Sequence, residues 1–235
     1  MLISKYIVYF MIFSFLGWIW ETIYCTVFNK KWESRGFLFG PVCPIYGVGA
    51  IAGFGIVDIL KFLSLPQLTW WQVVLISFFG SAVLEYATSV LLEKLFHAYW
   101  WDYSGMPLNV NGRICLPASL GFTVAGLLVV YVLYPFFSYV SSLVPSLLFE
   151  ISALIFVIVI TIDITLTVSA LTDIQSKVNS IDDSINDYMT DFVDDLYQNS
   201  TDLSKKVISR IRGVKFSKPT QTKIYMNLID KIKRK

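Results

Sequence analysis

Three glutamates inside apolar stretches are the residues of this sequence best suited to chemistry. Glu21 lies in FLGWIWETIY, Glu85 lies near the middle of a later stretch with Ser89 one turn further on, and Glu93 follows another turn later. An ionisable group in a bilayer costs about 2.5–3.5 kcal/mol on insertion scales, so such groups are usually functional or paired. We expect Glu21 and Glu85 to bind a cation or relay protons, whereas functional and structural roles are equally plausible for Glu93.

Two aspartates in apolar stretches have a simpler interpretation. Asp58 stands three residues before Lys61, and Asp163 stands between Thr161 and Thr165. Asp58 is expected to reach the outer membrane interface beside Lys61. Hydroxyl groups or a neighbouring helix would satisfy the carboxylate of Asp163. We therefore expect both aspartates to be structural.

The stretch RGFLFGPVCPIYGVG places Arg35, Cys43 and Tyr46 at the start of an apolar segment. Prolines in a first helical turn cost little, and a glycine-rich helix start lets backbone groups face a cavity. Residues 35–46 are therefore expected to line a cavity. No histidine accompanies Cys43, so burial is favoured over a nucleophilic role.

The stretch HAYWWDYSGMPLNVNGRICLPAS holds Asp102, Asn111 and Arg113 among aromatic residues. An aromatic belt at the interface explains the rings but not the dense polar side chains. We therefore expect residues 97–113 to form a partly re-entrant loop. Together with Arg35, Arg113 would hold anionic groups or pair with the glutamates, and Asp102 would act as a gate.

Five apolar stretches could position these residues as membrane-crossing helices, because a crossing needs about 20 mostly apolar residues. Charged residues make up 15% of the sequence, against roughly 25% in a typical soluble domain. The sequence predicts an all-α integral membrane bundle over residues 1–171 and a charged cytoplasmic helical tail over 172–235. The predicted spans are about 3–28, 41–63, 70–96, 114–140 and 147–171.

Basic residues are distributed unevenly among the connections between these spans. The first and third connections are basic, the second carries Lys61 alone, and the fourth carries none. By the positive-inside rule, the first and third connections and the tail belong in the cytoplasm. We therefore expect a multi-pass protein of the cell membrane with its N-terminus outside and its C-terminus inside. The candidate residues would then face the cytoplasm.

The tail carries apolar residues at steps of three and four, which is typical of a heptad seam. Two interpretations are equally supported. The tail is either a cytosolic helix that continues the fifth span, or a coiled coil that forms a homo-oligomer through residues 171–211, with its basic end on anionic lipid. The seam consists of Leu171, Ile174, Val178, Ile181, Ile185, Tyr188 and Phe192.

Cysteine and histidine usage excludes several classes of site. The three cysteines have no paired spacing and there is one histidine, so neither a disulfide framework nor a zinc site is indicated. We expect no cofactor, no metal and no nucleic-acid partner. The expected surroundings are the lipid bilayer.

Four blocks carry a family resemblance: FLGWIWE, RGFLFGPVCPIYGVG, LEYATSVLLEKLF and WWDYSGMPLNVNGRICLPAS. In this order they resemble the bacterial family named putative ABC-transporter type IV, or CmpB-like permeases. The likeness covers about residues 10–125. It implies the membrane subunit of a transporter. Because the sequence has no P-loop motif, coupling to ATP would need a separate ATPase subunit.

Three functions are compatible with these residues. The favoured one is a permease-like transport component with a cytoplasm-facing polar site. The alternative is an integral-membrane enzyme acting on a lipid or isoprenoid, with Glu85 or Asp102 as general acid or base and the arginines holding a phosphate. The third is a non-catalytic membrane adaptor that recruits partners through its tail.

Overall fold

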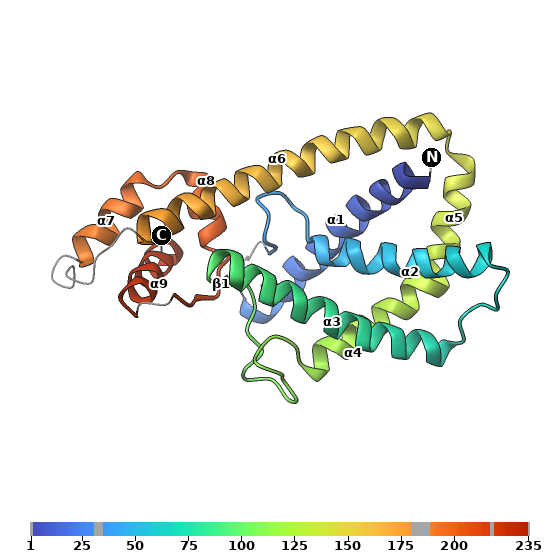
Figure 1. Cartoon of the computed structure of the whole chain (residues 1–235), viewed down its shortest axis with the longest axis horizontal. Coiled ribbons are helices and arrows are strands. Elements are labelled where there is room, and N and C mark those ends of the chain that lie inside the picture. The colour runs from blue at the N-terminus through green and yellow to red at the C-terminus, as the bar shows by residue number, and fades with distance from the viewer. Residues whose placement is uncertain (1, 31–34, 180–188, 217–218, 235) are drawn as a thin grey trace.

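The computed structural model describes residues 2–30, 35–179, 189–216 and 219–234. Within these residues, five helical segments are long and apolar enough to cross a membrane. They run back and forth along the long axis of the molecule (Figure 1), which confirms the predicted all-α membrane bundle. The segments are α1 (Leu2–Asn29), α2 (Pro44–Phe62), α3 (Trp70–Phe96), the continuous run of α4 (Leu116–Leu128), η1 (Val129–Leu133) and α5 (Tyr134–Leu143), and α6 (Ser146–Asn179).

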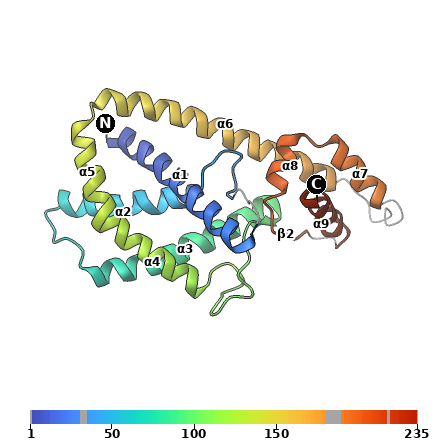
Figure 2. The same ribbon diagram turned by 180° about the vertical axis from the view of Figure 1, so that it is seen from behind.

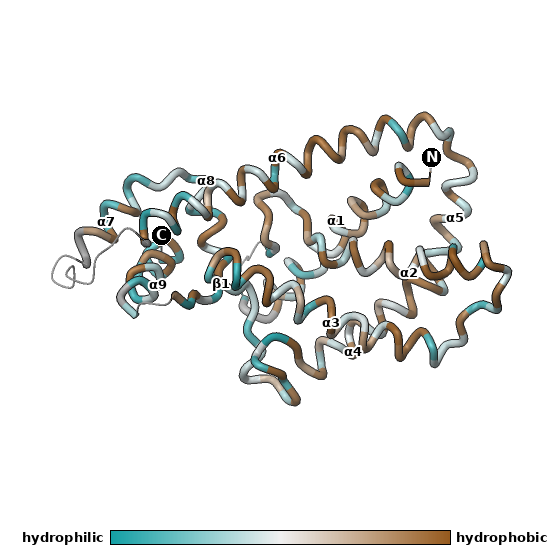
Figure 3. The backbone as a smooth tube through the Cα atoms, viewed as in Figure 1, coloured by the Kyte–Doolittle hydropathy of each residue, from teal (hydrophilic) through white to brown (hydrophobic). Residues whose placement is uncertain are grey.

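These segments form helices because a helix satisfies every backbone group internally, as a bilayer demands. They are apolar over most of their length, whereas the C-terminal part mixes hydrophilic and hydrophobic residues (Figure 3). Two helix boundaries can be compared with the predicted spans. Helix α2 begins only at Pro44, after Cys43 in extended conformation, because proline favours the first helical turn. Helix α6 continues to Asn179 without a break at residue 171.

The fourth span is bent where α4 meets α5 (Figure 2). Residues Val129–Leu133 form a π-helical turn just before Pro135. Proline has no amide hydrogen and its ring crowds the preceding turn, so it displaces the regular hydrogen-bond ladder. The proline therefore accounts for both the π turn and the bend.

One end of the bundle carries the N-terminus and the other carries the C-terminal helices (Figure 1); we call them the far end and the tail end. The far end is held by rings from three spans. Phe54 of α2 lies edge-on to Tyr9 of α1 at 5.4 Å and to Tyr134 of α5 at 5.2 Å, measured between ring centroids. Edge-to-face pairs of this kind add to the stabilisation from burial alone.

The segment between α1 and α2 folds back into the bundle, and both views show it between α1 and α6 (Figures 1 and 2). We call residues 35–43 the inserted loop. Its Leu38 is 1% exposed and lies in an apolar cluster with Met11 of α1 and Phe156 of α6. Gly36 has a φ of +101° and faces the Val42 carbonyl and the Cys43 sulfur, so the loop closes on itself at a position that favours glycine.

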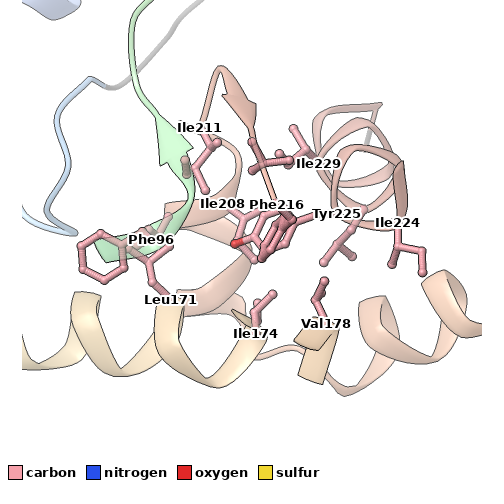
Figure 4. Close-up of a cluster of buried hydrophobic side chains, with 14 of the residues drawn as sticks. Phe96, Leu171, Ile174, Val178, Ile208, Ile211, Phe216, Ile224, Tyr225 and Ile229 are labelled. Atoms are coloured by element: carbon pink, nitrogen blue, oxygen red, sulfur yellow. The ribbon is translucent and has the colours of Figure 1, made fainter. Parts of the chain in front are cut away.

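The C-terminal helices are packed onto the tail end as a small domain. It contains α7 (Met189–Asn199), α8 (Asp202–Ile208) and α9 (Pro219–Arg234). Strand β1 (Ala98–Tyr99), directly after α3, pairs antiparallel with β2 (Gly213–Val214). A shared core joins Phe96 of α3 to residues of α6, α8 and α9 (Figure 4).

The described part of the heptad seam is buried by residues of the same chain. Leu171, Ile174 and Val178 are at most 2% exposed and belong to this shared core, and Phe192 packs against it. The apolar face of α9, including Ile224, is buried in the same core. Seam positions Ile181, Ile185 and Tyr188 lie outside the described residues. Self-association through residues 171–211 stays a prediction.

Candidate functional site

Glu85 is a buried carboxylate with incomplete hydrogen bonding. It lies three turns before the end of α3 and is 4% exposed. Its Oε1 accepts a 3.3 Å hydrogen bond from the Tyr103 hydroxyl, whereas its Oε2 has no hydrogen-bond partner among the described residues. Removing a polar atom from water without a partner costs several kcal/mol in apolar surroundings. This oxygen therefore retains the capacity to bind a proton or a cation.

Glu21 of α1 is the second glutamate of this region, and it faces α2. The Tyr46 hydroxyl donates a 2.6 Å hydrogen bond to its Oε1. A side chain at Gly17, one turn earlier on α1, would overlap the Tyr46 ring, so glycine allows the two helices to approach. The Tyr46 ring also lies 5.5 Å from the Phe122 ring of α4, centroid to centroid. Tyr46 thus brings the Glu21 carboxylate together with α2 and α4.

The charges of both carboxylates act on one phenol, that of Tyr103. Tyr103 lies in the connection between α3 and α4, and burial raises its pKa well above the ordinary value. The negative charges of Glu85 and Glu21 raise this pKa further. Within the described part of the chain, neither glutamate has a lysine or arginine ion-pair partner. We call Glu21, Tyr46, Glu85 and Tyr103 the carboxylate site.

Arg113 holds the connection between α3 and α4 against the last turns of α3. Its guanidinium pairs with Glu93, donates a 2.9 Å hydrogen bond to the Ser89 hydroxyl, and lies 5.6 Å from the centre of the Tyr86 ring. The Asn111 amide donates to the Tyr86 hydroxyl at 3.0 Å. These contacts bring four predicted residues together beside the carboxylate site. Arg113 is engaged by Glu93 and does not pair with Glu85.

Asp102 forms a local turn. Its Oδ1 accepts hydrogen bonds from the Ser104 amide at 2.9 Å and the Ser104 hydroxyl at 2.5 Å. These bonds lower the pKa of Asp102, and its side chain is exposed. A gating role for Asp102, and the predicted re-entrance of residues 97–113, stay predictions.

Cys43 is buried at the junction of the inserted loop and α2. Its amide donates a 2.9 Å hydrogen bond to the Ser14 carbonyl of α1. Burial and then the nearby Glu21 charge raise the pKa of its thiol to about 12, whereas Arg210 and Arg35 lower it. At neutral pH Cys43 is therefore a protonated thiol, which is not nucleophilic.

The two aspartates in apolar helices are fully hydrogen-bonded. Asp58 accepts from the Tyr6 hydroxyl at 2.7 Å on one oxygen and from the Tyr134 hydroxyl on the other. Asp163 accepts from the Phe39 amide at 2.9 Å and the Gly40 amide at 3.0 Å. Backbone amides of the inserted loop therefore make the shorter hydrogen bonds to Asp163, and the Thr167 hydroxyl donates a longer one at 3.5 Å. A hydroxyl was among the partners that the sequence suggested.

Two residues of this region were missed by sequence reasoning. Tyr103 follows Asp102 in a loop rich in aromatic residues, so nothing in the sequence distinguishes it from an interfacial ring. Arg210 belongs to the basic tail, yet it is 8% exposed and reaches the inserted loop. The only sequence signal is its position close to Val207, Ile208 and Ile211 in VISRIRGV. Among the described residues, no three His, Cys, Asp or Glu side chains come together as metal ligands.

The fold defines a multi-pass α-helical membrane protein with a buried polar site. The chain belongs to the family described as Putative ABC-transporter type IV, whose model matches residues 8–168. The match extends beyond the predicted 10–125 and includes the fourth span and most of the fifth. No curated protein and no solved structure matches the chain.

Proposed function

We propose that this chain is the membrane-embedded component of a transporter, and that Glu21 and Glu85 bind a proton or a cation at a site facing the cytoplasm. Family membership supports the transporter class. The charge bias of the connections supports a cytoplasmic tail end and an external N-terminus. The proposed ligand of the carboxylate site is positively charged, for the reasons given next.

The free Oε2 of Glu85 carries this proposal. Two carboxylates without a basic partner, placed beside two phenol groups, favour a positively charged ligand over an anionic one. The described residues offer no three-ligand metal cluster, so the proton is the simplest occupant. Tyr46 and Tyr103 would keep the glutamates oriented while that proton binds and leaves.

The alternatives receive less support from the geometry. An enzyme acting on a phosphorylated lipid would need Arg113 free to hold the phosphate, but Arg113 is engaged by Glu93 and Ser89. Nucleophilic chemistry at Cys43 would need a thiolate, and burial opposes one. A pure adaptor gives no reason to bury Glu85 with an unpaired oxygen.

The site is tested by carbodiimide labelling. Dicyclohexylcarbodiimide modifies carboxylic acids that are protonated in an apolar setting, and peptide mass spectrometry locates the adduct. Native membranes would be labelled across a pH series. We expect an adduct at Glu85 that decreases as the pH rises, and none at the fully hydrogen-bonded Asp58 or Asp163. Absence of an adduct at Glu85, or equal labelling at Asp58, would contradict the proposed site.

The transporter assignment is tested by gentle purification of the tagged protein from its own membranes. Coupling of transport to ATP would need a separate ATPase, because the sequence has no P-loop. We expect such an ATPase to co-purify in stoichiometric amount with both the wild-type protein and Glu85→Gln. A protein that retains a bound lipid or isoprenoid and no ATPase would instead favour the enzyme.

A further inference from the structure

The Arg210 side chain extends from the C-terminal domain into the membrane bundle. Its guanidinium donates hydrogen bonds to the carbonyls of Leu38 and, at 3.3 Å, Phe39, with a longer 3.5 Å contact to the Gly36 carbonyl. Three carbonyls of the inserted loop thus gather around one cation. Arginine suits this task because its planar fork presents several donors at once.

Asp163 of α6 holds the same loop through the opposite backbone groups. It accepts from the amides of Phe39 and Gly40, and the Thr167 hydroxyl also accepts from the Phe39 amide at 3.2 Å. Non-helical backbone inside a membrane bundle must find such partners. The amide and the carbonyl of Phe39 are therefore held by a carboxylate of the fifth span and by a guanidinium of the tail.

The inserted loop leads directly into the carboxylate site. Cys43 ends the loop and precedes the first residue of α2, and Tyr46 follows in the first turn with its hydroxyl on Glu21. Gly36 closes onto Val42 and Cys43. A shift of residues 36–40 must therefore move Cys43 and the start of α2.

The position of Arg210 depends on the C-terminal domain. Its neighbours Ile208 and Ile211 are both 0% exposed in the shared core (Figure 4). The Arg212 amide donates to the Tyr99 carbonyl at 2.8 Å, at the pairing of β1 with β2. Any displacement of this domain from α3 and α6 would withdraw Arg210 from the loop.

We infer that the C-terminal domain is a latch: Arg210 positions the inserted loop and keeps the junction with α2 closed, and displacement of the domain releases it. A regulatory role in transport follows from the proposed function of the carboxylate site. The latch itself is a property of the contacts between Arg210 and the loop. It can therefore be tested without a transport substrate.

The test measures alkylation of Cys43 by N-ethylmaleimide in membranes. The background carries Cys25→Ala and Cys115→Ala, so that Cys43 is the sole thiol. Arg210→Gln should accelerate alkylation about tenfold or more, as expected when hydrogen bonds from a charged donor are lost. Arg210→Lys, which keeps the charge but not the fork, should give an intermediate rate.

The charge of Arg210 and the opening of the loop change the alkylation rate of Cys43 in opposite directions, so the experiment can tell them apart. Arg210 lowers the pKa of the Cys43 thiol, so its removal leaves less thiolate and would by itself slow alkylation. A faster reaction in Arg210→Gln therefore reports an opened loop. Arg212→Gln, an exposed arginine two residues later, is the matched control and should leave the rate unchanged.

A second background, with Cys115 as the sole thiol, detects general loosening of the protein. Its alkylation rate should be the same with and without Arg210→Gln. Equal Cys43 rates in wild type and Arg210→Gln would overturn the latch, and so would a parallel increase at Cys115. Failure of carbodiimide labelling at Glu85 would overturn the proposed site but would leave these rates as expected.

Discussion

Glu85 and Asp58 are both carboxylates inside apolar helices, yet the two ends of the bundle treat them differently. At the far end, Asp58 accepts a tyrosine hydroxyl on each oxygen. In the half of the bundle nearer the tail end, Glu85 has one 3.3 Å hydrogen bond and one oxygen with no partner in the described part of the chain. The same chemical group therefore connects helices at one end and is left ready to bind at the other.

The difference shows that burial alone does not identify a functional acid in a membrane protein. Asp163 makes the same point, because backbone amides occupy both of its oxygens. A saturated carboxylate contributes to stability, and removing it leaves its donors unsatisfied. A buried carboxylate that lacks hydrogen-bond partners lowers stability. A protein retains such a group where its function requires it. Three substitutions follow, in order of the expected loss of stability.

Asp163→Asn should cause the largest loss. An amide offers one acceptor oxygen where the carboxylate offers two, so an amide of the inserted loop loses its partner. We expect the free energy of unfolding to fall by about 2–3 kcal/mol, as for hydrogen bonds to charged groups. Thermal unfolding in detergent, followed by tryptophan fluorescence, measures it. Asp173→Asn on the same helix removes only an exposed pair with Lys177 and should cost less than about 0.5 kcal/mol.

Asp58→Asn should cause a smaller loss of about 1–2 kcal/mol, because the two donors are hydroxyls that can rotate toward other acceptors. Tyr6→Phe removes one of the two bonds and should cost about half as much. Thermal unfolding of the single and double variants would show whether the effects overlap. A double variant no less stable than Asp58→Asn alone is expected, since both changes remove the same bond.

Glu85→Gln should change the free energy of unfolding by less than about 0.5 kcal/mol or increase it slightly, because a neutral side chain avoids the cost of burying a charge. The same variant should lose the carbodiimide adduct at this position. Thermal unfolding beside the wild-type protein measures the first effect. A loss as large as that of Asp163→Asn would place Glu85 among the structural acids.

The sequence was sufficient for the helices and for locating Glu85 as an acid inside an apolar segment, because apolar length and a charge within it are both local signals. A functional role for Glu85 stays a prediction. The sequence was not sufficient to predict the partners of such charged groups. The hydrogen bonds from the Phe39 amide to Asp163 and from Arg210 to the Leu38 carbonyl join positions more than 100 residues apart. No local pattern encodes which loop meets which acid.

The tail illustrates the same limit from another side. Steps of three and four correctly marked Leu171, Ile174 and Val178 as one apolar face. Such a pattern predicts that this face is buried, but it does not identify the residues that cover it. In the structure, residues of α8 and α9 cover it within one chain, which is why self-association is not needed to bury these positions.

The shared core at the tail end also sets an order of assembly. Phe96 ends the third span and Ala98 begins the strand that follows it. The residues that share their core, including Val207, Ile224 and Leu228, are synthesised more than 100 residues later. Until then, a growing chain with all five helices already in the bilayer still leaves this apolar surface uncovered. The membrane body can therefore be completed only after residues 207–228 have left the ribosome.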